Sequence, residues 1–155
     1  MSLVIALPDE PELRLDHLLL DVNGTLTDRG GLIRGVADRV ARAGSLLDVR
    51  LLSADTYGTL ADVAQEVGAV AAERVHTGAD KKAAATRLGP ATCAAIGNGT
   101  NDTELLRTVA LGIAVLGPEG ASSRALAAAD VVCGSIADAL DLLLDPRALT
   151  ATLRR

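Results

Sequence analysis

The sequence predicts an α/β protein: a Rossmann-like three-layer α/β/α sandwich around a mainly parallel sheet. Short apolar runs alternate with helical segments along the chain, and this alternation indicates right-handed crossovers between parallel strands. The composition is 49% hydrophobic with a single aromatic residue, Tyr57. Leucine, valine, isoleucine and alanine must therefore fill the core, which suits close packing of helices on a sheet.

Each expected strand is a short apolar run bounded by turn-forming residues. The first two runs, 2–7 and 13–20, flank a turn at residues 8–11 and are expected to form an antiparallel hairpin at a sheet edge. Residues 24–33 are rich in loop formers and are expected to hold no long element. The remaining strands are expected at residues 46–52, 69–75, 92–96, 111–116 and 131–132.

Helices are expected between these runs, where apolar residues recur at helical spacing. Gly68 is expected to close the second helix, and Asp80 to cap the third. Pro118 and Glu119 are expected to begin the fifth helix, and a capping box over residues 135–138 is expected to begin the last helix. The expected ranges are 36–44, 55–67, 80–88, 101–109, a helix that opens at residue 118, and 135–144.

The length, charge and composition of the chain predict the number of domains, the classes of partner and the cellular location. A chain of 155 residues without a linker or repeat predicts one domain over 1–155, with an N-terminal edge strand and turn over 1–12 and a C-terminal tail over 146–155. The paired Arg154-Arg155 end is expected to be frayed and solvated. The net charge of −5 and the lack of a basic cluster argue against a nucleic-acid partner. No signal peptide or membrane-spanning run is expected, and Cys93 and Cys133 fit reduced core residues. These features predict a cytoplasmic protein without a membrane partner.

A carboxylate follows the second apolar run. Asp21 comes directly after residues 18–20, and open α/β sheets bind their ligands at the carboxyl ends of parallel strands. Gly24 and Thr25 then allow a tight turn. A carboxylate in this place can act as a nucleophile toward a phosphoryl group.

Three further elements follow along the chain. Ser53 ends the next apolar strand, where its hydroxyl could hydrogen-bond a phosphoryl oxygen. Lys81 lies near a helix start, where its ammonium could neutralise both a phosphate and Asp21. Residues 97–102, Gly-Asn-Gly-Thr-Asn-Asp, follow the strand over 92–96. Taken singly, these are a strand-end serine, a surface lysine and a fragment of a dinucleotide-binding loop, so the order and spacing carry the argument.

In this order the four elements resemble the haloacid dehalogenase (HAD) superfamily. Residues 21–28 resemble its first motif, D-x-D-G-T-L/V, and residues 97–102 resemble its G-D-G-x-N-D motif, which holds Mg²⁺. Residues 97–132 also resemble the C-terminal part of P-type ATPase phosphorylation domains, so the chain looks most like small soluble relatives of those domains. The resemblance covers most of residues 13–145. It implies an HAD-like Rossmannoid fold, an aspartyl-phosphate intermediate and Mg²⁺ as the cofactor.

The resemblance also implies a role for individual residues. Lys81 fits the catalytic lysine better than Lys82, because the P-type pattern places that lysine seven residues before a helix leucine, here Leu88. The implied catalytic residues are Asp21, Asn23, Ser53 and Lys81; the implied substrate-binding residues are Gly24, Thr25, Ala54 and Asn101; the implied Mg²⁺ ligands are Asp21, Asn23, Asn98 and Asp102.

Two positions depart from the family pattern. Asn23 replaces the aspartate that gives and takes the proton, although its main-chain carbonyl can still bind Mg²⁺. Asn98 replaces a metal-binding aspartate with an uncharged amide. Two hypotheses follow. The protein is either a slow Mg²⁺-dependent phosphohydrolase, or a catalytically impaired protein of the same fold that binds phosphate ligands or has a regulatory role.

The spacing of the motifs leaves no room for a cap domain. Only 31 residues separate Asp21 from Ser53, and 27 separate Ser53 from Lys81. A capless site is open, so it could admit a small or a bulky phosphorylated substrate, or a neighbouring subunit of a homo-oligomer could cover it.

Overall fold

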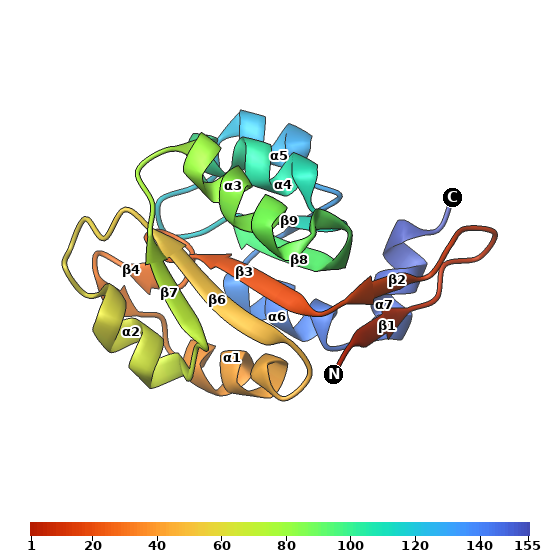
Figure 1. The fold of residues 1–155 in the computed structure, drawn as a ribbon, viewed down its shortest axis with the longest axis horizontal. Helices are drawn as coiled ribbons and strands as arrows, with labels where there is room; N and C mark the ends of the chain where they lie inside the picture. The colour runs from red at the N-terminus through yellow and green to blue at the C-terminus, as the bar shows by residue number, and fades with distance from the viewer.

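The computed structural model describes all of residues 1–155, and its centre is a six-stranded sheet (Figure 1). The strand order is β10-β9-β8-β3-β6-β7, and each neighbouring pair is parallel. This confirms the predicted fold class and shows that the sheet is parallel throughout. Its strands are β3 (His17–Asp21), β6 (Asp48–Ser53), β7 (Ala71–Arg74), β8 (Cys93–Gly97), β9 (Leu111–Val115) and β10 (Val131–Cys133).

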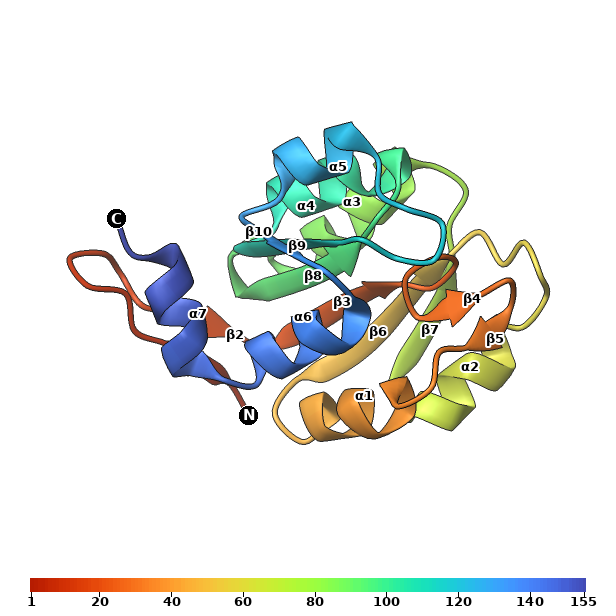
Figure 2. The ribbon, with the colours of Figure 1, turned by 180° about the vertical axis from the view of Figure 1, so that it is seen from behind.

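Helices cover both faces of the sheet and give the three layers (Figures 1 and 2). One face carries α1 (Val36–Gly44), α2 (Leu60–Val67) and α6 (Ile136–Leu143). The other carries α3 (Gly78–Leu88), α4 (Thr103–Thr108) and α5 (Ser123–Ala128).

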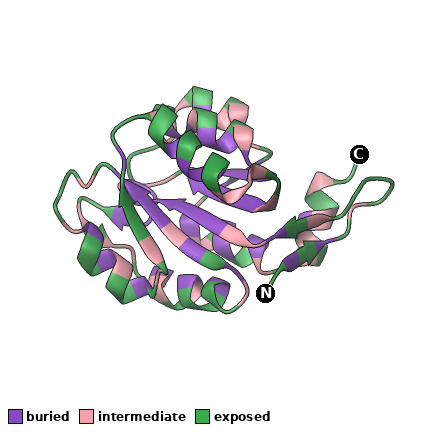
Figure 3. Cartoon of the chain, viewed as in Figure 1, coloured by how far each residue is buried: buried purple, intermediate pink, exposed green.

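The central strands are buried on both faces, as Figure 3 shows. Successive side chains of a strand point to opposite faces. In β3, Leu18 and Leu20 therefore join the core under α1 and α6, while Leu19 joins the core under α3 and α4. A strand buried on both sides reads as a continuous apolar run, which is why β3 and β8 were visible in the sequence.

The first apolar runs do not form the edge of the main sheet, so that prediction was wrong. The run over 13–20 breaks at Asp16, whose backbone N–H donates to Thr92 and whose carbonyl accepts from Asp48. Before the break, β2 (Leu13–Leu15) pairs antiparallel with β1 (Leu3–Ile5) in a separate two-stranded sheet.

The C-terminal residues form a helix over most of the predicted tail. Helix α7 (Pro146–Leu153) is capped by the Asp145 side chain and lies beside the β1–β2 hairpin (Figure 2). Leu149 is fully buried, and the hydroxyl of Thr150 donates to the carbonyl of Ala6. Most of the expected C-terminal tail is therefore a helix, because an apolar side of this segment covers the hairpin, while Arg154 and Arg155 lie beyond the helix and are exposed.

Two expected helix starts were wrong in ways that shape the site. Helix α2 begins at Leu60 instead of residue 55, because Asp55 adopts a positive φ of 56° and its carboxylate accepts from the Leu60 N–H. No helix opens at Pro118: a bridge between Gly117 and Gly120 closes a turn there, and α5 follows the capping residue Ser122. Segments 54–59 and 117–122 are thus loops at the carboxyl edge of the sheet.

Smaller differences concern helix ends and short elements. Helix α3 is capped by Thr77, and Asp80 is the third helical residue of the same capping box instead of the cap itself. The loop over 24–33 holds a small hairpin of β4 (Thr27–Asp28) and β5 (Gly31–Leu32). Single 3-10 turns cover Pro90–Thr92 and Thr100–Asp102. None of the helices has the length and apolar character needed to cross a membrane.

Candidate active site

Three neighbouring strands bring the predicted motifs to one edge. Strands β8, β3 and β6 are adjacent and parallel, so Gly97, Asp21 and Ser53 end at the same side of the sheet. Lys81, in α3, reaches this edge and donates to Oδ1 of Asp21 at 2.6 Å and to Oδ1 of Asp102 at 2.7 Å. All three side chains are buried. The site therefore contains one ammonium between two carboxylates.

The motif loop wraps closely around Asp102. Gly97 has no side chain, and a Cβ atom there would lie 2.5 Å from Cγ of Asp102. The backbone N–H groups of Asn98 and Gly99 donate to Oδ2 of Asp102 at 3.0 and 2.9 Å. Both Asp102 oxygens thus already accept hydrogen bonds, one from Lys81 and one from the loop.

The structure separates the two candidate lysines. Lys81 is 1% exposed and bonded to both carboxylates, whereas Lys82 is exposed on the outside of α3. Successive helical residues point about 100° apart, so only one of two adjacent lysines can face the sheet edge. The spacing argument for Lys81 agrees with this placement.

Burial changes the proton affinity of the paired groups. Loss of water around Asp21, followed by repulsion from Asp102, raises the pKa of Asp21 to about 6, although Lys81 and the Thr25 hydroxyl act in the opposite direction. Burial alone would lower the pKa of Lys81, but the two carboxylates outweigh it and raise that pKa above its ordinary value. The ammonium therefore stays charged, and Asp21 is the group that titrates near neutrality.

This raised pKa predicts a pH dependence for any reaction in which Asp21 is the nucleophile. Only the ionised carboxylate attacks, so without a divalent cation its reaction rate should rise with pH up to about 6 and then level off. A bound cation favours the ionised form and should shift this limb to lower pH. The rate of covalent labelling of Asp21, measured across pH with and without Mg²⁺, tests the pH dependence and its shift by the cation. A labelling rate that stays constant between about pH 5 and about pH 7 without metal would contradict the predicted pH dependence.

A small cavity of about 210 Å³ opens beside Asp21. Five predicted site residues line it, and three residues that were not predicted, Thr56, Gly99 and Glu119, complete its wall. Lys81 and Asp102 are buried and do not line the cavity; Lys81 contacts the lining residue Asp21, and Asp102 accepts from the backbones of the lining residues Asn98 and Gly99. The five predicted lining residues are Asp21, Asn23, Ala54, Asn98 and Asn101.

Ser53, Gly24 and Thr25 do not line this cavity, although the sequence analysis assigned them to catalysis or substrate binding. The Ser53 hydroxyl is buried and accepts from the Asp55 N–H at 2.9 Å. The Thr25 hydroxyl lies 2.8 Å from Oδ2 of Asp21 and 3.1 Å from Oδ1 of Asn98. Because a hydroxyl has one proton, Thr25 can donate to only one of these oxygens at a time.

The unpredicted Glu119 comes from the turn that was taken for a helix start. Residues 117–120 read Gly-Pro-Glu-Gly, and glycines on both sides of a Pro-containing pair are also a turn signal. That signal would have placed residue 119 in a loop after β9, at the same edge as Asp21.

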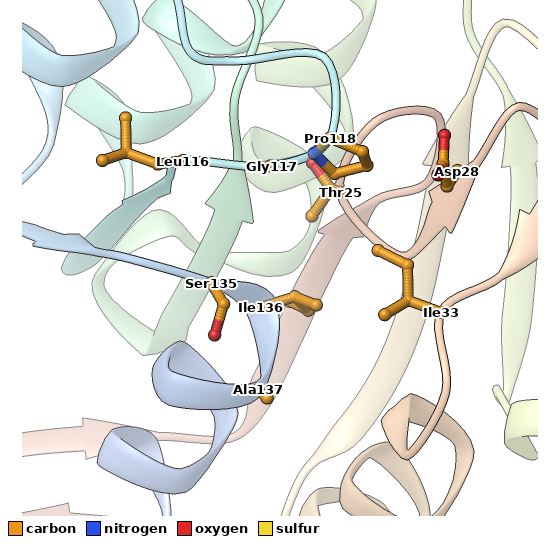
Figure 4. Close-up of a pocket in the computed structure, with 9 residues that line it drawn as sticks. All are labelled: Thr25, Asp28, Ile33, Leu116, Gly117, Pro118, Ser135, Ile136 and Ala137. Carbon is orange, nitrogen blue, oxygen red and sulfur yellow. The ribbon is translucent and has the colours of Figure 1, made fainter.

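A second cavity, of about 310 Å³, is lined by the residues drawn in Figure 4. Pro118 and Gly117 of the turn line it, and Ile33, Leu116 and Ile136 give it an apolar wall. Thr25 also lines it, although no residue of the buried ion group does. It is thus an apolar space next to the reactive edge of the sheet.

The oxygen atoms at the cavity suit a hard divalent cation. Asp21 offers a carboxylate and Asn98 an amide oxygen, and Mg²⁺ prefers such ligands together with several waters. No group of three or more acidic, histidine or cysteine side chains is gathered anywhere in the chain. The residues therefore fit Mg²⁺, but with few charged ligands.

Comparisons with known proteins give a family match and a partial relative. The family model described as haloacid dehalogenase-like hydrolase matches residues 64–139. An uncharacterised protein of Methanocaldococcus jannaschii is 53% identical over 60 residues, which are 39% of this chain and 64% of that protein. The aligned segment is thus less than two thirds of that relative.

Solved structures show the same fold. A 3-deoxy-D-manno-octulosonate 8-phosphate phosphatase from Moraxella catarrhalis, in complex with magnesium, phosphate and KDO, has a TM-score of 0.67 at 20% identity, over 89% of this chain and 92% of that one. A cobalt-bound deoxy-D-mannose-octulosonate 8-phosphate phosphatase from Haemophilus influenzae has a TM-score of 0.66 at 18% identity, over 88% and 91%. At these identities the likeness concerns the fold.

In its fold and motif order the chain is similar to haloacid dehalogenase-like hydrolases, whose family model matches residues 64–139. It is of the capless type, because only β4, β5, α1 and β6 follow the Asp21 loop up to Ser53, and only α2 and β7 lie between Ser53 and α3.

Proposed function

We propose that this protein is a Mg²⁺-dependent phosphohydrolase that cleaves a small phosphate ester or anhydride through an aspartyl phosphate on Asp21. The observation that carries the proposal is the buried group in which Lys81 joins Asp21 and Asp102, with Asp21 alone reaching the cavity. The match of residues 64–139 to a hydrolase family model and the phosphatase activity named for both solved structures of the same fold support it.

In the first half of the reaction an oxygen of Asp21 attacks phosphorus and the leaving-group oxygen departs. Lys81 holds Oδ1 of Asp21, which leaves Oδ2 as the attacking atom. The Thr25 hydroxyl can turn from Oδ2 to Asn98 and so free an electron pair on Oδ2. Mg²⁺, held by Asp21, the Asn23 main-chain carbonyl and Asn98, would supply neutralisation of the phosphoryl charge.

In the second half, water must attack phosphorus and release Asp21 with inorganic phosphate. Asn23 is half-buried and lines the cavity, but its amide cannot accept the water's proton. General acid–base help is typically worth about 10²–10⁴-fold in rate. Unless another side chain takes that proton, we expect breakdown of the aspartyl phosphate to be the slow step. Activated phosphates should react faster than alkyl phosphates, because their leaving groups need no proton.

A phosphatase panel with and without Mg²⁺ tests the function. Acetyl phosphate, p-nitrophenyl phosphate and an alkyl phosphate are compared on wild type and on Asp21→Asn, with phosphate release as the readout. Removing Mg²⁺ with a chelator should lower the wild-type rate by about 10²-fold or more, because several kcal/mol of charge stabilisation is lost. Asp21→Asn should lose all turnover under both conditions.

The same panel decides between an enzyme and a binding protein. Asn23 and Asn98 leave the site short of the charges of a typical member, which favours the binding alternative if turnover fails. If no phosphate is released under any condition while calorimetry detects inorganic phosphate bound by wild type and not by Asp21→Ala, the phosphohydrolase proposal is wrong.

A further inference from the structure

Glu119 is a carboxylate on the cavity wall that the mechanism above does not use. Of the eight lining residues, only Asp21 and Glu119 have carboxylate side chains, which can accept a proton. Asp21 is committed as the nucleophile in the proposed reaction. Glu119 is therefore the one remaining lining side chain able to take a proton from a water molecule in the cavity.

The Glu119 carboxylate lies beside the first motif. A Cβ atom at Gly24 would be only 2.5 Å from Oε2 of Glu119, and 3.1 Å from Nδ2 of Asn98. The positive φ of 75° at Gly24 and its missing side chain leave this space open for the carboxylate. Oε2 of Glu119 therefore lies beside Gly24, the residue directly after Asn23. Asn23 occupies the position of the acid/base aspartate in the family that the motif resembles.

The turn that carries Glu119 is fixed to the second glycine-rich loop. The Asn98 amide donates to the carbonyl of Gly120 at 2.9 Å, and the Ser122 N–H donates to the carbonyl of Asn98 at 2.8 Å. The backbone of Gly117 also packs directly on the carbonyl of Gly24. The backbone around Glu119 is therefore held against both loops of the site.

The Glu119 side chain itself is free. It is exposed, and no hydrogen bond or ion pair engages its oxygens. Some exposed acidic residues of the chain are paired, as Glu73 is with Arg87 and Asp141 with Arg39, whereas others, such as Asp62 and Glu104, are not. An unpaired carboxylate at a phosphate-binding cavity would oppose anion binding, so its position calls for a chemical role.

We propose that Glu119 is the general base for hydrolysis of the aspartyl phosphate, supplying the carboxylate that Asn23 lacks. The role rests on the proposed function. Glu119 removes a proton from water as the water oxygen bonds to phosphorus. The bond between phosphorus and the Asp21 oxygen then breaks, Asp21 regains its electron pair, and the proton leaves Glu119 for bulk solvent.

The test separates formation of the aspartyl phosphate from its breakdown. Acetyl phosphate has a good leaving group, so formation should need no proton from Glu119. In Glu119→Gln the rate of phosphoenzyme formation should equal wild type, while its decay after removal of acetyl phosphate should slow by about 10²-fold or more. Rapid-quench trapping measures formation, and loss of the trapped species with time measures decay.

Two further variants distinguish proton transfer from a structural effect. Asn23→Asp in the Glu119→Gln background should restore rapid decay, because it supplies a base on the same wall. Glu104→Gln removes an equal charge from an exposed residue outside the cavity and should decay as wild type. Thermal melting of each variant checks that the fold is kept.

The outcomes are distinct. Wild-type decay in Glu119→Gln overturns the role of Glu119 and leaves the proposed function standing. Equal slowing of formation and decay, or no rescue by Asn23→Asp, also overturns it, since a base acts on decay alone. Failure of wild type to form any phosphoenzyme, with Asp21→Asn as the blank, overturns the proposed function and the role of Glu119 with it.

Discussion

Asn23→Asp is expected to raise turnover of an alkyl phosphate by about 10²-fold. Asn23 lines the cavity beside Asp21, and an aspartate there can protonate the departing oxygen as well as activate water. Acetyl phosphate, which needs no proton on its leaving group, should gain less. The ratio of kcat values for the two substrates, measured in wild type and variant, checks this.

Asn101→Asp is the matched control for this substitution. It adds the same charge to the wall of the same cavity, but at an exposed residue of the Thr100–Asp102 turn. Added negative charge alone should not accelerate attack on a phosphate. An equal gain in both variants, or no gain in Asn23→Asp with either substrate, would show that missing proton transfer does not limit the rate.

Lys81→Met is expected to lower both activity and stability. Removing the ammonium leaves Asp21 and Asp102 buried with no counter-charge, and breaking a buried pair in this way costs about 3–5 kcal/mol of unfolding free energy. Loss of the charge that balances the nucleophile should also lower kcat by about 10²–10³-fold. Urea denaturation at neutral pH measures the first effect and steady-state kinetics the second.

The stability loss should depend on pH with a defined sign. Asp21 already has a pKa raised to about 6, and loss of Lys81 raises that pKa further. A carboxyl group with a raised folded-state pKa favours the folded state at low pH and loses that contribution as pH rises, so acidification should restore part of the stability of Lys81→Met.

Lys82→Met provides the control, because Lys82 is exposed on the same helix. Its unfolding free energy should change by less than about 0.5 kcal/mol. Comparable losses in the two variants would mean that the ion group contributes nothing beyond an ordinary lysine of α3.

The motif order predicted where the reactive groups meet, because parallel neighbouring strands all end at one edge. Asp21, Lys81 and Asp102 meet there as the sequence predicted. The roles assigned to Asn23, Asn98 and the Mg²⁺ ligands stay predictions, since their tests are chemical. The roles of Ser53 and Thr25 also stay predictions: the Ser53 hydroxyl accepts from the Asp55 N–H, and the Thr25 hydroxyl donates to Asp21, so neither lines the cavity directly.

From the sequence alone the fold class and the polar groups at this sheet edge could be predicted. Buried parallel strands must be continuous apolar runs, and the order of Asp21, Lys81 and Asp102 after such runs resembles one family of this fold. Three features could be seen in the folded chain alone: residues 146–153 form a helix, the first hairpin forms a sheet of its own, and Glu119 lines the same cavity as Asp21. Helical and turn conformations at residues 118–121 satisfy local propensities equally well. The choice between them comes from contacts with Gly24 and Asn98, which lie more than 20 residues away in the chain.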